Sequence, residues 1–250
     1  LTISDIVNAQ MRLYKKLGIK NAVAVIGGSM GGMQALCYAI EHPTFAKHYI
    51  PMATTAYTRP WAIALNKIAI EAIRHDPNFQ NGNYEKDDLK ARGLVGLAVG
   101  RMAGLIAYLS PNLFINKFGR DYVETDGLYE LFGRFEIEKY LEHNSYSFPK
   151  FFDPLSYLYI CKTINIFDAG RNKDKLEDSF LKIEGKLHLI AFKDDMLFFP
   201  NEMEEIRDIM IKIGKKDQVT FKLVDSSSGH DSFLVEVEKF EEHIKDILKD

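Results

Sequence analysis

One stretch of sequence decides the fold: Ala22-Val23-Ala24-Val25-Ile26-Gly27-Gly28-Ser29-Met30-Gly31-Gly32. The apolar, β-branched run at its start predicts a buried strand, and the apolar residues 33–40 after the glycines predict a helix. Gly27, Ser29 and Gly31 therefore form a G-x-S-x-G pattern at a strand-to-helix turn, which is the context of a nucleophile elbow. We expect the glycines on both sides of Ser29 to avoid Cβ collisions. We also expect the helix N-terminus to direct backbone N–H groups towards the site.

Two phosphate-binding motifs also place a glycine-rich turn between a strand and a helix. The dinucleotide-binding pattern G-x-G-x-x-G is not matched, because Ser29 stands where its second glycine would be. The P-loop is not matched either, because no Lys-Ser or Lys-Thr pair follows the glycines. On the motif alone, a purely structural tight turn stays open beside the nucleophile elbow.

The composition is that of an ordinary globular protein, with 250 residues, 46% hydrophobic and 27% charged. This length allows one sizeable domain or a core with a large insertion. A net charge of −3 gives no indication of a nucleic-acid partner or an anionic membrane, and no apolar run is long enough to predict a membrane-spanning helix. We expect the two cysteines, Cys37 and Cys161, to be buried thiols and not a disulfide, which favours a cytoplasmic location.

Strand and helix patterns alternate at both ends of the chain, and the middle is helical. The first end predicts a helix over 3–17, a strand over 22–26, a helix over 33–40 and a strand over 49–53 that Pro51 weakens. The middle predicts helices over 62–74, 89–109, 111–118, 135–143 and 153–167. The second end predicts a strand over 186–192, a helix over 201–213, a strand over 219–224 and an amphipathic helix over 232–248. We therefore expect an α/β core of residues 1–56 and 169–250, with a helical cap of residues 57–168 inserted between them.

A nucleophilic serine needs a general base and a carboxylate that orients this base. Of the seven histidines, His230 follows the last predicted strand, although a histidine there could also belong to a surface turn. Asp194 and Asp195 follow the predicted strand over 186–192, and either could be the carboxylate. Because the carboxyl ends of parallel strands share one edge of a sheet, we expect Ser29, one aspartate and His230 to meet there. Their order along the chain is that of α/β-hydrolase folds. No cysteine and histidine spacing predicts a metal site.

Several further strings share the pattern of one enzyme family. They are residues 2–7 (T-I-S-D-I-V), 26–35 (I-G-G-S-M-G-G-M-Q-A), 76–79 (D-P-N-F), 100–102 (G-R-M), 108–110 (Y-L-S), 118–120 (F-G-R), 156–159 (S-Y-L-Y), 195–198 (D-M-L-F) and 229–234 (G-H-D-S-F-L). The chain resembles the homoserine O-acetyltransferase family of α/β-hydrolase-fold acyltransferases over almost its whole length. The resemblance implies an α/β-hydrolase fold with a mostly parallel sheet.

The resemblance also implies roles for individual residues. Ser29 corresponds to the nucleophile, Asp195 to the orienting acid and His230 to the base, and the backbone N–H of Met30 to an oxyanion-hole donor. Arg101 would bind the carboxylate of the amino-acid substrate through its planar fork. Tyr108 would line the same pocket, and Asp231 would hold the substrate ammonium group.

The family's substrates are small molecules, L-homoserine and an acyl-CoA, with acetyl-CoA as co-substrate and no permanently bound cofactor or metal. The resemblance therefore implies an acetyl transfer in methionine biosynthesis, by a homodimer in the cytoplasm. A succinyl-CoA donor, a serine acceptor and an α/β-fold esterase stay open as alternatives. A further alternative is an inactive fragment or a subunit.

The chain departs from the family pattern in two places. Ile70 stands where the family usually carries an arginine. By analogy of fold, family members have about a hundred more residues before the segment that begins at Leu1. Those residues hold the first strands of the sheet and the second oxyanion-hole N–H. We expect a processed or shortened chain, or an N-terminal partner chain, and an exposed edge of the sheet.

Overall fold

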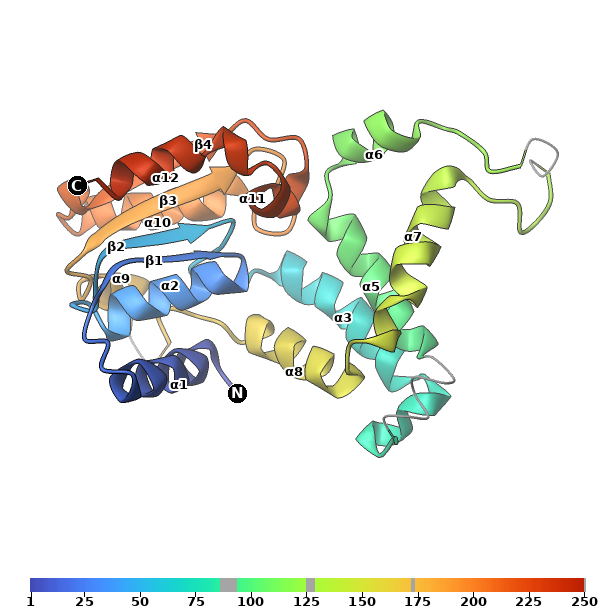
Figure 1. Cartoon of the computed structure of the whole chain (residues 1–250), viewed down its shortest axis with the longest axis horizontal. Coiled ribbons are helices and arrows are strands. Elements are labelled where there is room, and N and C mark those ends of the chain that lie inside the picture. Colours follow the sequence, from blue (N-terminus) through green and yellow to red (C-terminus); the bar gives the residue numbers. More distant parts are fainter. Residues whose placement is uncertain (86–93, 125–128, 172–173, 250) are drawn as a thin grey trace. The chain divides into compact units, whose positions relative to one another are not determined.

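The computed structural model describes residues 1–85, 94–124, 129–171 and 174–249 (Figure 1). It divides into two compact units, each formed by its own internal contacts. Leu1–Arg59 and Thr163–Asp250 form the first, which we call the α/β unit. Pro60–Lys162 form the second, which we call the helical unit.

The α/β unit is built on a four-stranded parallel sheet with the strand order β1-β2-β3-β4. The strands are β1 (Ala22–Gly28), β2 (Ala46–Met52), β3 (Lys186–Phe192) and β4 (Val219–Val224). The predicted α/β class and its parallel sheet are thus confirmed. β1 is not buried as its apolar run predicts, because it exposes 59% of Val23 and 43% of Ile26. The reason is that β1 lies at an edge of the four described strands, which confirms the expected exposed edge of the sheet.

β2 begins three residues before the predicted strand and accommodates Pro51 inside a sheet. Proline has no N–H to donate, so it is rarely tolerated in a central strand. Here the register between β2 and β3 passes from Tyr49–Leu187 directly to Met52–Ile190. Pro51 therefore lies where no pairs join β2 to β3, and it pairs instead with Gly27 of β1.

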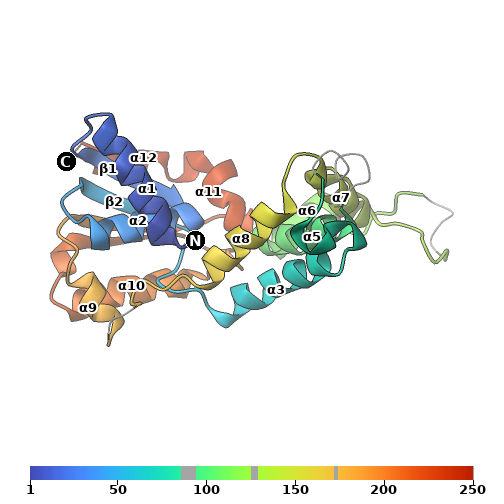
Figure 2. The same ribbon diagram turned by 90° about the horizontal axis from the view of Figure 1, so that it is seen from below.

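Helices cover this sheet (Figure 2). They are α1 (Ile3–Lys16), α2 (Met30–Glu41), α9 (Leu176–Phe180), α10 (Pro200–Lys212), α11 (Ser232–Val235) and α12 (Glu241–Ile247), with 3₁₀ turns at Lys216–Gln218, Gly229–Asp231 and Val237–Lys239. α1 begins with a capping box, in which Thr2 accepts from the Asp5 N–H and Asp5 accepts from the Thr2 N–H. α2 packs on β1 and β2, and α10 packs on β3 and β4. This packing fixes the ends of the strands that carry the site.

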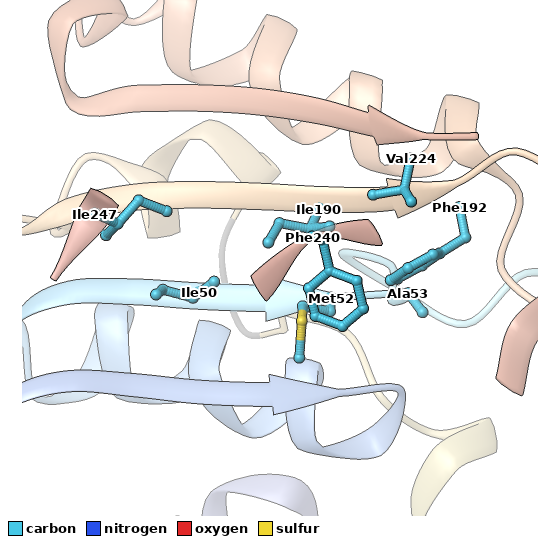
Figure 3. Packing of buried hydrophobic residues seen from close by; sticks show 8 residues of the cluster. All are labelled: Ile50, Met52, Ala53, Ile190, Phe192, Val224, Phe240 and Ile247. Atoms are coloured by element: carbon cyan, nitrogen blue, oxygen red, sulfur yellow. The ribbon is translucent and has the colours of Figure 1, made fainter. Parts of the chain in front are cut away.

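The predicted helix over 232–248 is wrong, because the structure breaks it into α11, a 3₁₀ turn and α12. The sequence contains no glycine or proline there. The break lets Phe240 and Ile247 lie against the sheet in a cluster with residues of β2, β3 and β4 (Figure 3). The Phe240 ring meets the Phe192 ring edge-on at 5.5 Å. Tertiary packing has therefore overridden local helix propensity.

The helical unit contains α3 (Pro60–Arg74), α5 (Val95–Tyr108), α6 (Pro111–Phe118), α7 (Glu136–Tyr146) and most of α8 (Pro154–Asn165), with 3₁₀ turns at Pro77–Gly82 and Phe148–Lys150. The first residues of the predicted helix 89–109 lie outside the described part, and the described helix starts at Val95. α3 and α5 approach closely, because a Cβ on Gly96 would lie 2.2 Å from the Ala72 carbonyl oxygen. The buried Asp76 ties the two together by accepting from the N–H groups of Asn78 and Gly96.

In the described part of the chain, no single helix is long and apolar enough to cross a bilayer. The pair α5 and α6, bent by 100°, passes this test together on length and composition alone.

Candidate active site

Ser29 lies at the sharp turn between β1 and α2, in a backbone conformation that residues other than glycine rarely adopt. Its φ is 57° and its ψ is −121°. Two hydrogen bonds hold the residue there. The Ser29 N–H donates to the Met52 carbonyl (2.9 Å), and Thr54 Oγ1 donates to the Ser29 carbonyl (2.9 Å). Such conformations cost about 1–3 kcal/mol and cluster at functional sites.

The glycines around Ser29 are needed for space, but not all of them. A Cβ on Gly27 would lie 2.3 Å from the Gly31 carbonyl oxygen, and one on Gly28 would lie 2.3 Å from the Phe233 ring. A Cβ on Gly31 would meet nothing within 4 Å. A Cβ on Gly32 would lie 2.7 Å from the Thr54 Cβ. The expected collisions therefore occur on both sides of Ser29, and Gly31 is the exception.

Replacing Gly27 by alanine is expected to lower the free energy of unfolding by about 3 kcal/mol, because the clash is with backbone and no rotamer relieves it. For a chain of this size, this corresponds to a fall in Tm of about 6–12 °C. Gly31→Ala is the matched control and should keep or raise the Tm, since its Cβ has open space. Thermal unfolding followed by circular dichroism compares the two. Equal Tm values for both variants would contradict the steric argument.

The structure brings Ser29, His230 and Asp195 together at the carboxyl ends of β1, β4 and β3. The Nε2 of His230 lies 2.8 Å from Ser29 Oγ, and its Nδ1 lies 2.8 Å from Asp195 Oδ2. His230 is 3% exposed and Asp195 is 2% exposed. A buried carboxylate on one side of the imidazole and a hydroxyl on the other is the arrangement that makes a serine nucleophilic.

Asp195, and not Asp194, is the aspartate that reaches the histidine. Its second oxygen, Oδ1, accepts from the N–H groups of Leu197 (2.9 Å) and Phe198 (3.0 Å). These bonds leave Oδ2 directed at His230 and satisfy the buried carboxylate. Asp194, one residue earlier, is half-buried.

Two aromatic rings flank the imidazole. Phe198 and Phe233 meet the His230 ring near edge-on, with centroids 5.4 and 5.7 Å away. Sequence reasoning gave these residues no role, although both lie in strings shared with the family. Their rings limit the motion of the base.

Met30 is the first residue of α2. The first helical hydrogen bonds run from the N–H groups of Gly32 and Met33 to the Ser29 carbonyl. The N–H of a first helical residue has no carbonyl within its own helix to bind, and the helix dipole favours negative charge there. The Met30 N–H can therefore donate to an oxyanion beside Ser29.

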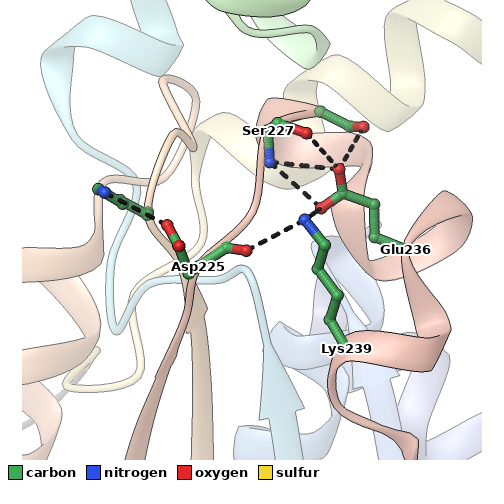
Figure 4. A network of polar contacts seen from close by, with 6 residues as sticks. Asp225, Ser227, Glu236 and Lys239 are labelled. Carbon is green, nitrogen blue, oxygen red and sulfur yellow. Dashed lines mark hydrogen bonds and ion pairs between the residues drawn. The ribbon is translucent and has the colours of Figure 1, made fainter.

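Glu236 is a residue that sequence reasoning missed, and it holds the loop that carries His230 (Figure 4). Its Oε1 accepts from the hydroxyls of Ser227 and Ser228, both at 2.8 Å, and both carboxylate oxygens accept from the Ser227 N–H at 3.2 Å. Lys239 forms an ion pair with Oε2 at 3.2 Å. Burial alone would raise the pKa of Glu236, but these bonds hold it below its usual value. No motif marks this glutamate, which resembles the other acids of the same segment.

The helical unit contains two of the three residues expected to bind the amino acid, Arg101 and Tyr108. The guanidinium of Arg101 on α5 lies 5.0 Å from the centre of the Phe148 ring and 5.5 Å from that of Tyr108. Burial raises the pKa of Tyr157, and the positive charge of the nearby Arg101 opposes this shift. Ile70 is half-buried on α3.

Asp231 ends the 3₁₀ turn that begins at Gly229, one residue after the base. Cys37 and Cys161 are free and buried, as expected, and burial raises the pKa of each thiol to about 12. Neither thiol can therefore act as a nucleophile near neutral pH. No group of three metal-ligating side chains occurs among the described residues.

Comparison with known proteins agrees with this geometry. The family model described as alpha/beta hydrolase fold matches residues 1–237. A homoserine O-acetyltransferase of Nautilia profundicola is 55% identical over 249 residues, which cover 100% of this chain and 67% of the relative. Homoserine O-acetyltransferase from Bacillus anthracis superposes with a TM-score of 0.91 at 23% identity, covering 100% of this chain and 66% of that one. Esterase E22 superposes with a TM-score of 0.88 at 27% identity, covering 99% and 67%.

The chain thus spans about two thirds of the length of each of these proteins. The likeness to the Bacillus anthracis structure concerns the fold alone, whereas the 55% identity extends over the whole of this chain. The strings around Ser29, Asp195 and His230 lie inside the matched region. The chain therefore belongs to the homoserine O-acetyltransferase family, within the α/β-hydrolase fold.

Proposed function

We propose that this chain carries the catalytic centre of an enzyme that transfers an acetyl group from acetyl-CoA to the hydroxyl of L-homoserine through an acyl-serine. The observation that supports this most directly is the continuous hydrogen-bond chain from Ser29 through His230 to Asp195. The reaction itself comes from the name of the relative at 55% identity.

In the first half-reaction, Ser29 Oγ attacks the carbonyl carbon of the thioester while its proton passes to His230 Nε2. Asp195 stabilises the resulting imidazolium and keeps its orientation. The negative charge on the former carbonyl oxygen is stabilised by the Met30 N–H at the start of α2. The C–S bond then breaks, His230 returns the proton to the departing CoA sulfur, and Ser29 is left as an acetyl ester.

In the second half-reaction, the γ-hydroxyl of homoserine attacks the acetyl ester. His230 takes the hydroxyl proton, the same N–H stabilises the second oxyanion, and collapse breaks the bond to Ser29 Oγ. His230 then protonates Ser29. The chain returns to its starting state, and the product is O-acetylhomoserine.

Arg101 is the proposed ligand of the homoserine carboxylate, with Tyr108 lining the same pocket, and Asp231 is the proposed ligand of the ammonium group. The Arg101→Lys variant keeps the charge but loses the planar fork. We expect it to raise the KM for homoserine about 10–100-fold, the value of one charged hydrogen bond. Acetyl-enzyme formation, which precedes homoserine binding, should not change. Arg74→Lys, an exposed arginine on α3, is the control. A KM equal to that of the parent would remove Arg101 from the site.

The second candidate function is ester hydrolysis, in which water takes the acyl group. The similarity to esterase E22, at 27% identity, supports hydrolysis as an alternative. Product analysis with and without homoserine separates the two functions. A transferase forms O-acetylhomoserine at the expense of free acetate, whereas acetate release that homoserine leaves unchanged identifies a hydrolase.

The acyl donor and the acceptor are proposed to be those of the family. The donor is acetyl-CoA, with succinyl-CoA as the alternative to test beside it. Serine is one methylene shorter than homoserine, a difference worth about 1–3 kcal/mol in a binding pocket. We assign the enzyme to methionine biosynthesis as a cytoplasmic homodimer, and its buried free thiols agree with a reducing compartment. Light scattering checks the assembly.

A further inference from the structure

Glu236 connects the end of α11 to the loop that precedes His230. It ends α11, where the chain leaves helical geometry, and its carboxylate crosses to the loop between β4 and His230. Ser227 and Ser228 of that loop bind it through two hydroxyls and one N–H. Glu236 is only 8% exposed, so these hydrogen bonds form largely out of water.

The loop so held leads directly into the base. After Ser228, only Gly229 precedes His230, and Gly229 has a φ of 74°. Because a single residue separates Ser228 from His230, a displacement of Ser228 shifts the backbone that carries the imidazole. The tolerance is small, since Nε2 must stay within hydrogen-bond reach of Ser29 Oγ.

Lys239 makes a second connection to the same region. Lys239 pairs with Glu236 Oε2, and its Nζ also donates to the Asp225 carbonyl at 3.1 Å. Asp225 in turn pairs with Lys193, two residues before Asp195 in the loop that follows β3. These contacts therefore connect the loops that carry the acid and the base.

From these contacts, and given the proposed role of His230, we infer that Glu236 is a positioning residue that fixes the base loop through Ser227 and Ser228. The partners of its carboxylate are Ser227, Ser228 and Lys239, so it acts on the base through the loop. Its oxygens serve as acceptors for these serines, and Oε1 alone accepts from both hydroxyls. The hydrogen bonds that lower the pKa of Glu236 keep it ionised near neutral pH.

The test compares Glu236→Ala and Glu236→Gln with Glu238→Ala in the purified protein. Glu238 is two residues away and exposed, and among the described residues no hydrogen bond or ion pair of its side chain is found. The first readout is the pre-steady-state rate of Ser29 acetylation by p-nitrophenyl acetate. The second is the far-downfield proton resonance of the His230 Nδ1–H bonded to Asp195, which needs no turnover.

We expect Glu236→Ala to slow acetylation about 100-fold, the effect of displacing a catalytic group by about 1 Å, with little change in KM. Its Nδ1–H resonance should broaden or vanish while the far-ultraviolet circular dichroism stays that of the parent. Glu236→Gln keeps an acceptor for the serines and should restore most of the rate and the resonance. Glu238→Ala should match the parent in both.

The inference is overturned if folded Glu236→Ala keeps the parental resonance and rate, or if the glutamine variant is no better than alanine. If Glu236→Ala does not fold, Ser228→Ala decides instead, because it removes one donor to Glu236. It should slow acetylation in the parent and also in Glu236→Gln, which keeps the acceptor oxygen, and a parental rate in Ser228→Ala would then overturn the inference. The proposed function fails separately: it falls if the parent itself acetylates a residue other than Ser29, whatever Glu236 does.

Discussion

Replacing Ser29 by alanine is expected to lower kcat/KM for acetyl transfer about 10⁶-fold, the scale found when a triad nucleophile is removed. The alanine keeps the backbone turn, the glycines and the Met30 N–H, and it removes only the atom that forms the acyl bond. Incubation with acetyl-CoA followed by mass spectrometry should find one acetyl group on the parent, located on Ser29, and none on the variant. An acetylated Ser29→Ala chain would show that another residue is the nucleophile.

The glycine variant at the same position separates chemistry from strain. Ser29→Gly also lacks the hydroxyl and should be as inactive as Ser29→Ala. Glycine, however, adopts a φ of 57° without a Cβ penalty. The relief of about 1–3 kcal/mol exceeds the loss of about 0.5–1 kcal/mol from glycine's extra freedom in the unfolded chain. We expect a higher Tm for Ser29→Gly than for Ser29→Ala, and the opposite order would show that the turn is not strained.

The second large effect is expected at Asp195. An asparagine there should lower kcat about 10⁴-fold, as an amide in this place does in another triad. The amide still accepts from the N–H groups of Leu197 and Phe198 through its oxygen, so the loop keeps its fold. Its NH₂ then faces His230 Nδ1 as a donor. The imidazole must accept there and carry its proton on Nε2, where it cannot take the proton of the serine.

The neighbouring aspartate supplies a matched control. Asp194→Asn makes the same chemical change one residue away, and we expect it to retain the parental kcat to within a few-fold. Steady-state kinetics on both variants, with the rate of acetylation measured separately, decides between the two aspartates. A larger loss in Asp194→Asn than in Asp195→Asn would reverse the assignment.

The elbow and the order of the site residues could be predicted because short-range rules govern them. A glycine-rich turn after a β-branched run has few conformations available, and parallel strands bring their carboxyl ends to one edge. Ser29 and His230 follow from these two facts. The strand pattern left Asp194 and Asp195 equal, because the choice depends on which carboxylate the loop turns towards the imidazole, and only the family resemblance favoured Asp195.

The C-terminal segment shows where such rules fail. Residues 232–248 have the amphipathic pattern of one helix and no breaker, yet the chain leaves the helix at Glu236. Two long-range interactions explain the break: Glu236 binds the base loop, and Phe240 packs on Phe192. Neither partner is visible from within the segment, so no local reading of the sequence finds them.

The separation of the triad along the chain has a consequence for folding. Ser29 and His230 are 201 residues apart, and Asp195 and His230 are 35 apart. Contacts this distant in sequence form late, after the entropy of closing long loops has been overcome. A molecule in which β4 has not yet joined β3 has a serine but no base beside it. The amplitude of the acetylation burst is therefore proportional to the number of molecules in which β4 has joined the sheet. Acetylation of Ser29 can thus be used to follow refolding.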